Sequence, residues 1–533
     1  MRDLNLYLNK VKNIKLYFFI IFITGWLIAN DYGVNIDDNF YYSNGLTTYN
    51  YAKSFFINIF SSNTVDLSIY REKMLSYPVV FELFLFLICD LMNISESAKI
   101  YLVAAKINFI FFFISLILFY RIIRMRFNKL FLGVLGTTLI VFSPRIFSSS
   151  FFNTRDTFFL SLFICFVYFM YNFINKKNFK NIILLSLFSV FLVNTRILGI
   201  VPVAMFVLLY IFFGLNTFEN VKKEIKLITL YIIFFILFTY CFWPYLWADP
   251  ILNYKKAIFD IVKYHEASIT INYYFGERIS SNLTPWHYRI IWMIITTPVV
   301  IVLLSLIGVL IFSFKIFKII NQDFNKKNTL NQRDFLDIHL FCTILTTLFC
   351  MIKFNATQYG EWRHIYFLYP IIIYMNIIAI NWIYSLTGKK IYQAICSSII
   401  LLNLLYVASW SFLNHPNQYI FFNFLSKNYS IKNFDLDSWG ISHKQSLNYI
   451  LEKDENTKIN IFAIGFTSLK DAYLSLEENK KKRIVLSDLK TAKYIIDSKT
   501  KKIREPKINK NHFNKFYEII VDKTPITTVY VKK

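Results

Sequence analysis

Two adjacent carboxylates, Asp37 and Asp38, follow shortly after the first long apolar segment of the chain. Charged side chains at the mouth of a membrane span are costly beside lipid, so an acid pair there favours a functional role. A carboxylate within reach of a hydroxyl can act as a general base and take its proton. The alternative is a solvated pair of loop acids that merely flanks a helix.

Arginines recur near the ends of later apolar segments. The guanidinium fork matches phosphate oxygens, and its charge can stabilise a departing phosphate. Five arginines are predicted on the membrane side that carries fewer basic residues: Arg145, Arg155, Arg196, Arg278 and Arg363. A lone arginine at a span end is often a snorkelling anchor, but five on this side favour the binding of an anion. Asp156 directly follows Arg155 and adds a third carboxylate to this side.

Further polar and aromatic residues fall in the same predicted loops. Six are candidates for contact with a substrate: Glu82, Trp243, Trp286, His287, Glu361 and His364. The tryptophans also suit an interfacial belt, and His287 also suits a loop interface. Three carboxylates could bind a divalent ion, but no HxxxH spacing supports one. A divalent metal is therefore left open, and no other cofactor is predicted.

The composition is that of a polytopic α-helical membrane protein. Of the 533 residues 56% are hydrophobic, and the mean hydropathy is +0.44, which is too apolar for an ordinary soluble domain. Apolar runs of roughly 18–22 residues recur and are long enough to cross a bilayer. The net charge of +25 comes largely from short loops and the C-terminal tail, and no basic-aromatic nucleic-acid module is visible.

Eleven spans follow from the hydropathy and from the placement of basic residues on the inner side. Basic residues precede the first span, which predicts a cytoplasmic N-terminus, and the eleventh span leaves the C-terminal tail outside. The predicted spans are 16–29, 101–120, 130–147, 157–174, 181–195, 197–214, 227–246, 288–314, 336–353, 364–385 and 391–411.

The apolar segment 77–93 is predicted not to span. It contains Glu82 and Asp90, and counting it as a span would place the basic residues 121–129 on the outer side. We therefore expect a helix lying on the outer surface, within a first outer loop of residues 31–98.

The chain divides into two predicted domains. Residues 1–414 form the transmembrane domain, and residues 415–533 form an outer tail. Within the tail, a helix over 446–453 alternates with short β-like runs at 458–464, 483–486, 494–496, 518–521 and 527–531, which predicts a small α/β domain.

Seven short stretches, taken in order, resemble the C-type fold of membrane glycosyltransferases. The sequence is similar to the protein O-mannosyltransferase and lipid A aminoarabinose transferase superfamily, and closer still to a bacterial group called glycosyltransferase family 39. The stretches are 77–83, 143–147, 152–156, 243–247, 282–288, 360–370 and 415–419.

The resemblance implies transfer of a sugar, with inversion, from a polyprenyl-phosphate donor to a hydroxyl acceptor on the outer face of a bacterial inner (plasma) membrane. It implies that Asp37 is the first-loop catalytic acid, with Asp38 as its neighbour and Asp156 as the second-loop acid. The family pair is commonly Asp-Glu, and the second loop often reads Asn-Pro-Lys-Asp where this chain has Asn-Thr-Arg-Asp.

On this reading Arg155, Arg196, Arg278 and Arg363 hold the donor phosphate. The acceptor is a glycolipid, a polymer or a protein. The alternative function is a transporter or flippase of lipid-linked sugars, which would also use cations and a lipid groove.

Overall fold

The computed structural model describes residues 2–61, 65–217, 221–267, 269–326, 331–354, 357–386, 390–464, 469–500, 508 and 512–533. Residues 327–330 and 387–389, which carry part of the predicted inner-side basic clusters, lie outside the described residues.

The described chain is an integral membrane protein built mainly of apolar helices. Seven helical segments are long and apolar enough to cross a bilayer, and a bent pair brings the number to eight. The seven lie in α5 (Ser97–Phe127), α8 (Asp156–Asn175), α11 (Val221–Cys241), α14 (Val299–Lys326), α15 (Gln332–Lys353), η3 (Arg363–Leu368) joined to α16 (Tyr369–Ser385), and α17 (Lys390–Leu413).

Three shorter apolar helices stand where the remaining spans are predicted. They lie in α1 (Arg2–Ile28), α9 (Phe179–Thr195), and η1 (Ile197–Gly199) followed by α10 (Ile200–Thr217). Each predicted span therefore has a helical counterpart. The count of eleven stays a prediction, because the apolar segments Asn13–Ile28, Phe179–Thr195 and Ile197–Phe213 are short for a bilayer.

Two predicted spans are broken before a proline. The span predicted at 130–147 is α6 (Leu130–Val141) followed by α7 (Pro144–Phe152), with a bend of 68° between them. The span predicted at 288–314 is α13 (Tyr288–Thr296) and then α14, with Pro298 in the gap. Proline lacks an N–H and disfavours the helical conformation of the residue before it, which accounts for the break at both places.

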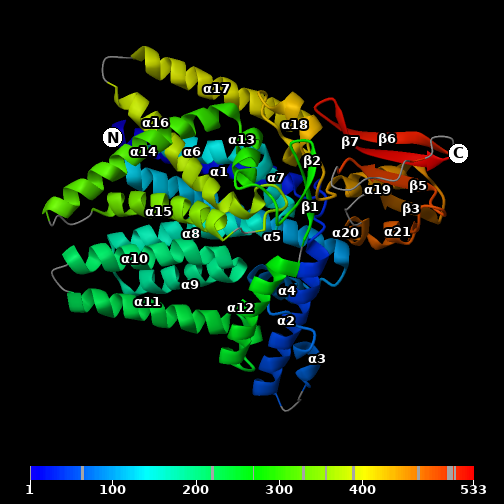
Figure 1. The fold of residues 1–533 in the computed structure, drawn as a ribbon, viewed down its shortest axis with the longest axis horizontal. Helices are drawn as coiled ribbons and strands as arrows, with labels where there is room; N and C mark the ends of the chain where they lie inside the picture. Colours follow the sequence, from blue (N-terminus) through cyan, green and yellow to red (C-terminus); the bar gives the residue numbers. More distant parts are fainter. Residues whose placement is uncertain are drawn as a thin grey trace.

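The first loop folds into helices that cross the end of the bundle. They are α2 (Asp38–Phe60), α3 (Ser68–Arg71) and α4 (Val80–Leu91). α4 has 12 residues, well short of the roughly 20 needed to span, which agrees with the prediction for 77–93. In Figure 1, α2 and α12 (Pro250–Ala267) run across the direction of the long helices.

The C-terminal tail forms an α/β domain. A five-stranded sheet has the order β4-β3-β5-β7-β6, in which β3 is parallel to β4 and β5, and β7 is antiparallel to β5 and β6. Each of the five predicted β runs overlaps one of its strands: β3 (Ile459–Ile464), β4 (Ile484–Leu486), β5 (Tyr494–Ser498), β6 (Phe513–Val521) and β7 (Thr524–Lys532). The helices are η4 (Gln418–Ile420), α18 (Lys427–Asn433), α19 (Ser442–Lys453), α20 (Leu469–Leu474) and α21 (Glu478–Lys481).

One end of the helical bundle gathers the elements outside the spans. The first-loop helices, α12, the hairpin of β1 (Ile271–Tyr274) and β2 (Glu277–Ser280), and the C-terminal domain all lie at the right-hand end in Figure 1, and the N-terminus lies toward the other end. We call the right-hand end the loop end.

Candidate active site

A chain of alternating charges lies at the loop end. Arg363 Nη1 is 2.8 Å from Asp37 Oδ2, and Arg363 Nε is 3.9 Å from Asp156 Oδ2. Asp156 Oδ1 is in turn 2.5 Å from Arg196 Nη2. Four residues from four separate segments thus form one network.

Each member of this network occupies the end of a helix. Asp37 is the N-cap of α2, Asp156 is the first residue of α8, Arg196 follows α9, and Arg363 opens η3. Helix ends that lie on one side of a membrane share one layer, so residues distant in sequence can meet there.

Local turns fix two of these side chains. The Asp156 backbone N–H donates to Asn153 Oδ1 at 2.9 Å, and Asn153 Nδ2 donates to Asp156 Oδ2 at 3.0 Å. Gly360 has φ of +63°, and a Cβ at this position would lie 2.7 Å from Arg363 Nε. A residue with a side chain at position 360 would therefore crowd Arg363.

The acid pair separates into two environments. The side chain of Asp37 is 34% exposed and faces Arg363, whereas Asp38 is 3% exposed and its Oδ2 accepts the N–H of Asn35 at 3.2 Å. Burial raises the pKa of the Asp38 carboxyl well above its usual value, and the nearby acids Asp471, Asp37 and Glu82 raise it further against the lowering effect of the Asn35 N–H. Asp37 is thus the accessible carboxylate, and Asp38 is the buried one.

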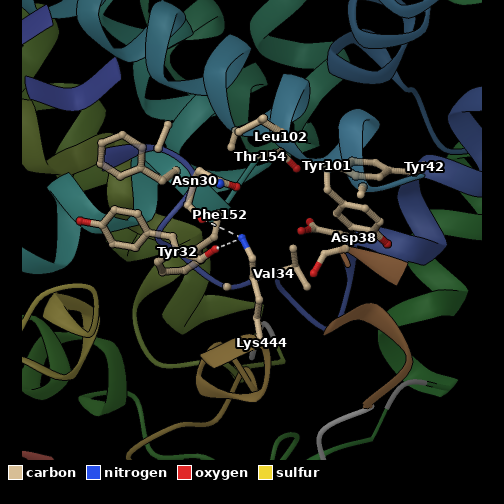
Figure 2. Close-up of a pocket in the computed structure, with 16 residues that line it drawn as sticks. Asn30, Tyr32, Val34, Asp38, Tyr42, Tyr101, Leu102, Phe152, Thr154 and Lys444 are labelled. Carbon is tan, nitrogen blue, oxygen red and sulfur yellow. Dashed lines mark hydrogen bonds between the residues drawn. The ribbon is translucent and has the colours of Figure 1, made fainter. Parts of the chain in front are cut away.

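Asp38 lines a small cavity of about 30 Å³. Figure 2 shows Asp38 beside Tyr42 and Tyr101, with Lys444 of the C-terminal domain reaching into the same space. A cavity of this size holds one or two water molecules and no sugar. This cavity therefore lies beside the proposed site and is not the substrate pocket.

Glu82 and Arg155 form a second buried pair beside the network. Arg155 Nη2 is 3.3 Å from Glu82 Oε1, and its guanidinium lies 3.9 Å from the centre of the Tyr41 ring. Burial raises the pKa of Glu82, and Arg155 partly opposes that shift.

Glu361 and His364 flank Arg363 in the sequence, and each contacts an arginine. Glu361 forms a buried ion pair with Arg145 and lies 3.4 Å from Ser438 Oγ. The ring Nδ1 of His364 is 3.2 Å from a terminal nitrogen of Arg289.

Several of these arginines keep an unmet donor. The Nε atoms of Arg155, Arg196, Arg289 and Arg363 are buried and have no hydrogen-bond partner among the described residues. A buried donor without an acceptor is costly, so such a group needs an explanation. Arg145 Nε is also buried without a hydrogen-bond partner in the described part of the chain, and this set of donors suits an anion with several oxygens.

Three residues of this region were not predicted from the sequence. The guanidinium of Arg363 lies 4.2 Å from the centre of the Trp439 ring, Arg289 lies on α13 beside His364, and Asp471 Oδ1 accepts the N–H of Asn39 at 3.0 Å. A lone tryptophan in the polar stretch 435–440 was the only sequence signal for Trp439. Nothing in the sequence pattern pointed to Asp471.

Four predicted site residues lie apart from this network. Arg278 is on the exposed strand β2, with its guanidinium 6.0 Å from the centre of the Tyr273 ring. Trp243 packs in a separate apolar cluster with Tyr51 and Met74. Trp286 is 61% exposed, and His287 Nδ1 is 2.7 Å from the Tyr274 hydroxyl.

The described carboxylates do not fit a divalent metal. No group of three or more His, Cys, Asp or Glu side chains is placed to hold an ion among the residues that the structure describes. Asp37 and Asp156 are instead held by guanidinium groups. The chemistry below therefore uses no metal.

Comparison with known proteins gives structural matches only. No protein-family model matches the chain, and no curated protein matches its sequence. The structure of ArnT from Cupriavidus metallidurans bound to undecaprenyl phosphate matches with a TM-score of 0.47 at 11% identity, over 97% of this chain and 98% of that one.

Oligosaccharyltransferase structures from Archaeoglobus fulgidus also match. AglB in complex with an inhibitory peptide and a dolichol-phosphate gives a TM-score of 0.45 at 11% identity, over 91% of this chain and 69% of that one. The complex with Zn and sulfate gives 0.43 at 10% identity, and this chain spans 60% of its length. All of these matches have TM-scores below 0.5. At such TM-scores and identities they carry no activity or ligand over to this chain.

Proposed function

We propose that this protein is a membrane glycosyltransferase that moves a sugar from a polyprenyl-phosphate donor to a hydroxyl acceptor. The observation that carries the proposal is one accessible carboxylate, Asp37, held 2.8 Å from a buried arginine within a cluster of guanidinium groups that keep unmet donors. A base beside a phosphate cradle is what this transfer requires.

The reaction proposed is a single displacement. Asp37 takes the proton as the acceptor O–H bond breaks, the acceptor oxygen bonds to the anomeric carbon, and the bond from that carbon to the phosphate oxygen breaks. The electron pair leaves with the polyprenyl phosphate. Attack opposite the leaving group inverts the anomeric carbon.

Arg196 and Arg363 are proposed to receive the phosphate, together with Arg289. Each of the three has a buried Nε donor, and Arg196 and Arg363 already hold carboxylates, which are exchangeable anionic partners. When phosphate competes for Arg363, the hold of this arginine on Asp37 weakens. A carboxylate released from a cation is a stronger base, so donor binding would activate Asp37.

Arg155 is proposed to act more indirectly. It is bound to Glu82 and stacked on Tyr41, so it supports the wall next to Asp156. Arg278 was also predicted to hold phosphate, and its exposed position on β2 favours a role at the entrance for the donor or acceptor.

The site is proposed to face outward across a bacterial plasma membrane. The support is the charge distribution, because basic residues such as Arg126, Lys177 and Lys315 occur at helix ends and loops predicted to be cytoplasmic. On this orientation the C-terminal domain is also outside.

A transfer assay in proteoliposomes tests the proposal. Radiolabelled sugars on polyprenyl phosphate would be supplied, and label would be followed into lipid, polymer and protein fractions. We expect transfer by the wild type, and a loss of roughly 10²–10⁴-fold in Asp37→Asn, the usual contribution of a general base.

The matched control is Asp90→Asn, because Asp90 forms an exposed ion pair with Lys53 away from the network. This variant should transfer sugar like the wild type. Full activity in Asp37→Asn would contradict the assignment of the base. Movement of lipid-linked sugar between leaflets without transfer would contradict the proposal and would indicate a flippase.

A further inference from the structure

The helix that begins at the acid pair lacks a cap of its own. Asp37 occupies the N-cap position of α2, yet its side chain makes no capping hydrogen bond and instead binds Arg363. The first N–H groups of a helix have no partner within the helix, and an N-cap side chain normally accepts one of them.

The C-terminal domain supplies the missing acceptor. Asp471 of α20 accepts the N–H of Asn39, the second residue of α2, at 3.0 Å across 432 positions of sequence. Asp471 is itself buried, with 4% of its surface exposed. It occupies the place that an N-cap side chain would otherwise fill.

The same domain also holds the chain just before the acid pair. Lys444 Nζ of α19 donates to the backbone oxygens of Asn30 at 2.7 Å and of Tyr32 at 3.0 Å (Figure 2). A Cβ at Gly33 would lie 1.9 Å from the backbone oxygen of Ile441, so the two segments touch backbone to backbone. Segment 30–39 is therefore fixed on both sides of Asp37.

We propose that the C-terminal domain is a working part of the site, in which Asp471 is a positioning residue that caps α2 from outside and so leaves the carboxylate of Asp37 available for Arg363 and the acceptor. This inference rests on the proposed function, in which the Asp37 carboxylate takes the proton of the acceptor. A capping hydrogen bond to that carboxylate would hinder the proton transfer.

Two variants of Asp471 separate the loss of the acceptor oxygen from other effects of the substitution. Asp471→Asn keeps an oxygen that can accept the Asn39 N–H, whereas Asp471→Ala removes it. Burial raises the pKa of Asp471 to about 6, with Asp37 adding to the rise, so near neutral pH the Asn variant removes a negative charge but keeps the acceptor oxygen. Glu452→Ala serves as the control, because Glu452 is exposed on α19 of the same domain.

The first measurement is hydrogen exchange of the full-length protein in nanodiscs, followed in peptides that cover residues 35–41. Loss of an N-cap acceptor corresponds to about a two- to thirtyfold change in helix-start opening, so we expect exchange to accelerate by that factor in Asp471→Ala. Asp471→Asn and Glu452→Ala should exchange like the wild type. Lys444→Met, which releases the other side of the segment, should also accelerate exchange there.

The second measurement is turnover in the same samples. We expect Asp471→Ala to lower kcat by a similar factor with little change in the KM for the donor, and Asp471→Asn to restore it. Unchanged exchange in Asp471→Ala would overturn the proposal, as would equal losses in the Ala and Asn variants. If the wild type transfers no sugar, the proposed function fails, and the exchange measurement still decides whether Asp471 caps α2.

Discussion

Two buried clusters of acids and bases lie at opposite ends of the bundle, and they differ in how fully their groups are paired. Away from the loop end, Asp337 of α15 is completely buried, and each of its carboxylate oxygens has two donors. Oδ1 accepts from Arg126 Nε at 3.1 Å and from the Tyr374 hydroxyl, and Oδ2 accepts from Arg126 Nη2 at 2.6 Å and from Lys315 Nζ.

At the loop end the groups are incompletely paired. Asp37 is one-third exposed, with Arg363 Nη1 at 2.8 Å, and five arginines keep a buried Nε donor without a hydrogen-bond partner among the described residues. Both clusters pair aspartates with arginines, so these two residue types alone do not separate them. A saturated cluster can only hold helices together, whereas an unsaturated one retains binding capacity for a ligand.

The largest effect that separates the clusters should come from Asp337→Ala. The change leaves Arg126, whose side chain is 13% exposed, without its carboxylate, while Lys315 keeps Asp334 at 3.1 Å. Breaking a fully buried pair typically costs about 3–5 kcal/mol, which sets the upper limit for this partly exposed one. We expect a marked drop in the midpoint of thermal unfolding in detergent, with transfer activity per folded molecule retained.

Asp90→Ala provides the reference for this measurement. It removes an ion pair whose side chains are 42–47% exposed, so its effect should stay below about 1 kcal/mol. A fall in unfolding temperature no larger than that of Asp90→Ala would mean that the saturated cluster does not stabilise the bundle.

A smaller effect should come from Arg363→Lys. Lysine keeps the charge but cannot direct two nitrogens toward Asp37 and Asp156, and it loses the planar contact with Trp439. One lost hydrogen bond to a charged group corresponds to about 1.5–3 kcal/mol, so kcat/KM for the donor should fall roughly 10- to 100-fold.

Arg126→Lys is the counterpart at the opposite end. The same exchange there removes one of the two bonds to Asp337 and should lower stability without changing kcat/KM. If the two variants gave the same pattern of activity and stability, the division between a structural and a functional cluster would be wrong.

The parts of the site that the sequence predicted share one property, namely position at a span end. Asp37, Asp156, Arg196 and Arg363 could be grouped because hydropathy places the ends of spans and the basic residues orient them. Arg278 was predicted on the same side of the membrane but within a loop, and it lies on an exposed strand, because a position in a loop does not specify how that loop folds back.

The parts that the sequence did not predict depend on long-range packing. Trp439 and Asp471 come from the tail and reach the site only because the C-terminal domain docks on segment 30–39. The five strands of that domain followed from local β patterning, but its docking has no local signal. The helix breaks before Pro144 and Pro298 did have a signal, which long apolar runs obscured.

The smallest effect should come from Asp38→Asn, one residue away from the proposed base. Burial raises the pKa of Asp38, so the folded protein favours its protonated form, and an asparagine oxygen can still accept the N–H of Asn35. Turnover should therefore change by less than the factor that corresponds to about 1 kcal/mol, in contrast to Asp37→Asn.

The pH dependence of the stability tests whether Asp38 is neutral in the folded protein. Because the folded pKa of Asp38 lies above its unfolded value, its contribution to stability is fully present below the unfolded pKa and is lost as the pH rises through the folded pKa. The unfolding temperature of Asp38→Asn, relative to that of the wild type, should therefore rise as the pH is raised. A gain at falling pH would mean that Asp38 is ionised in the fold, and the acid pair would then act as two charged carboxylates and not as one base beside a buried neutral acid.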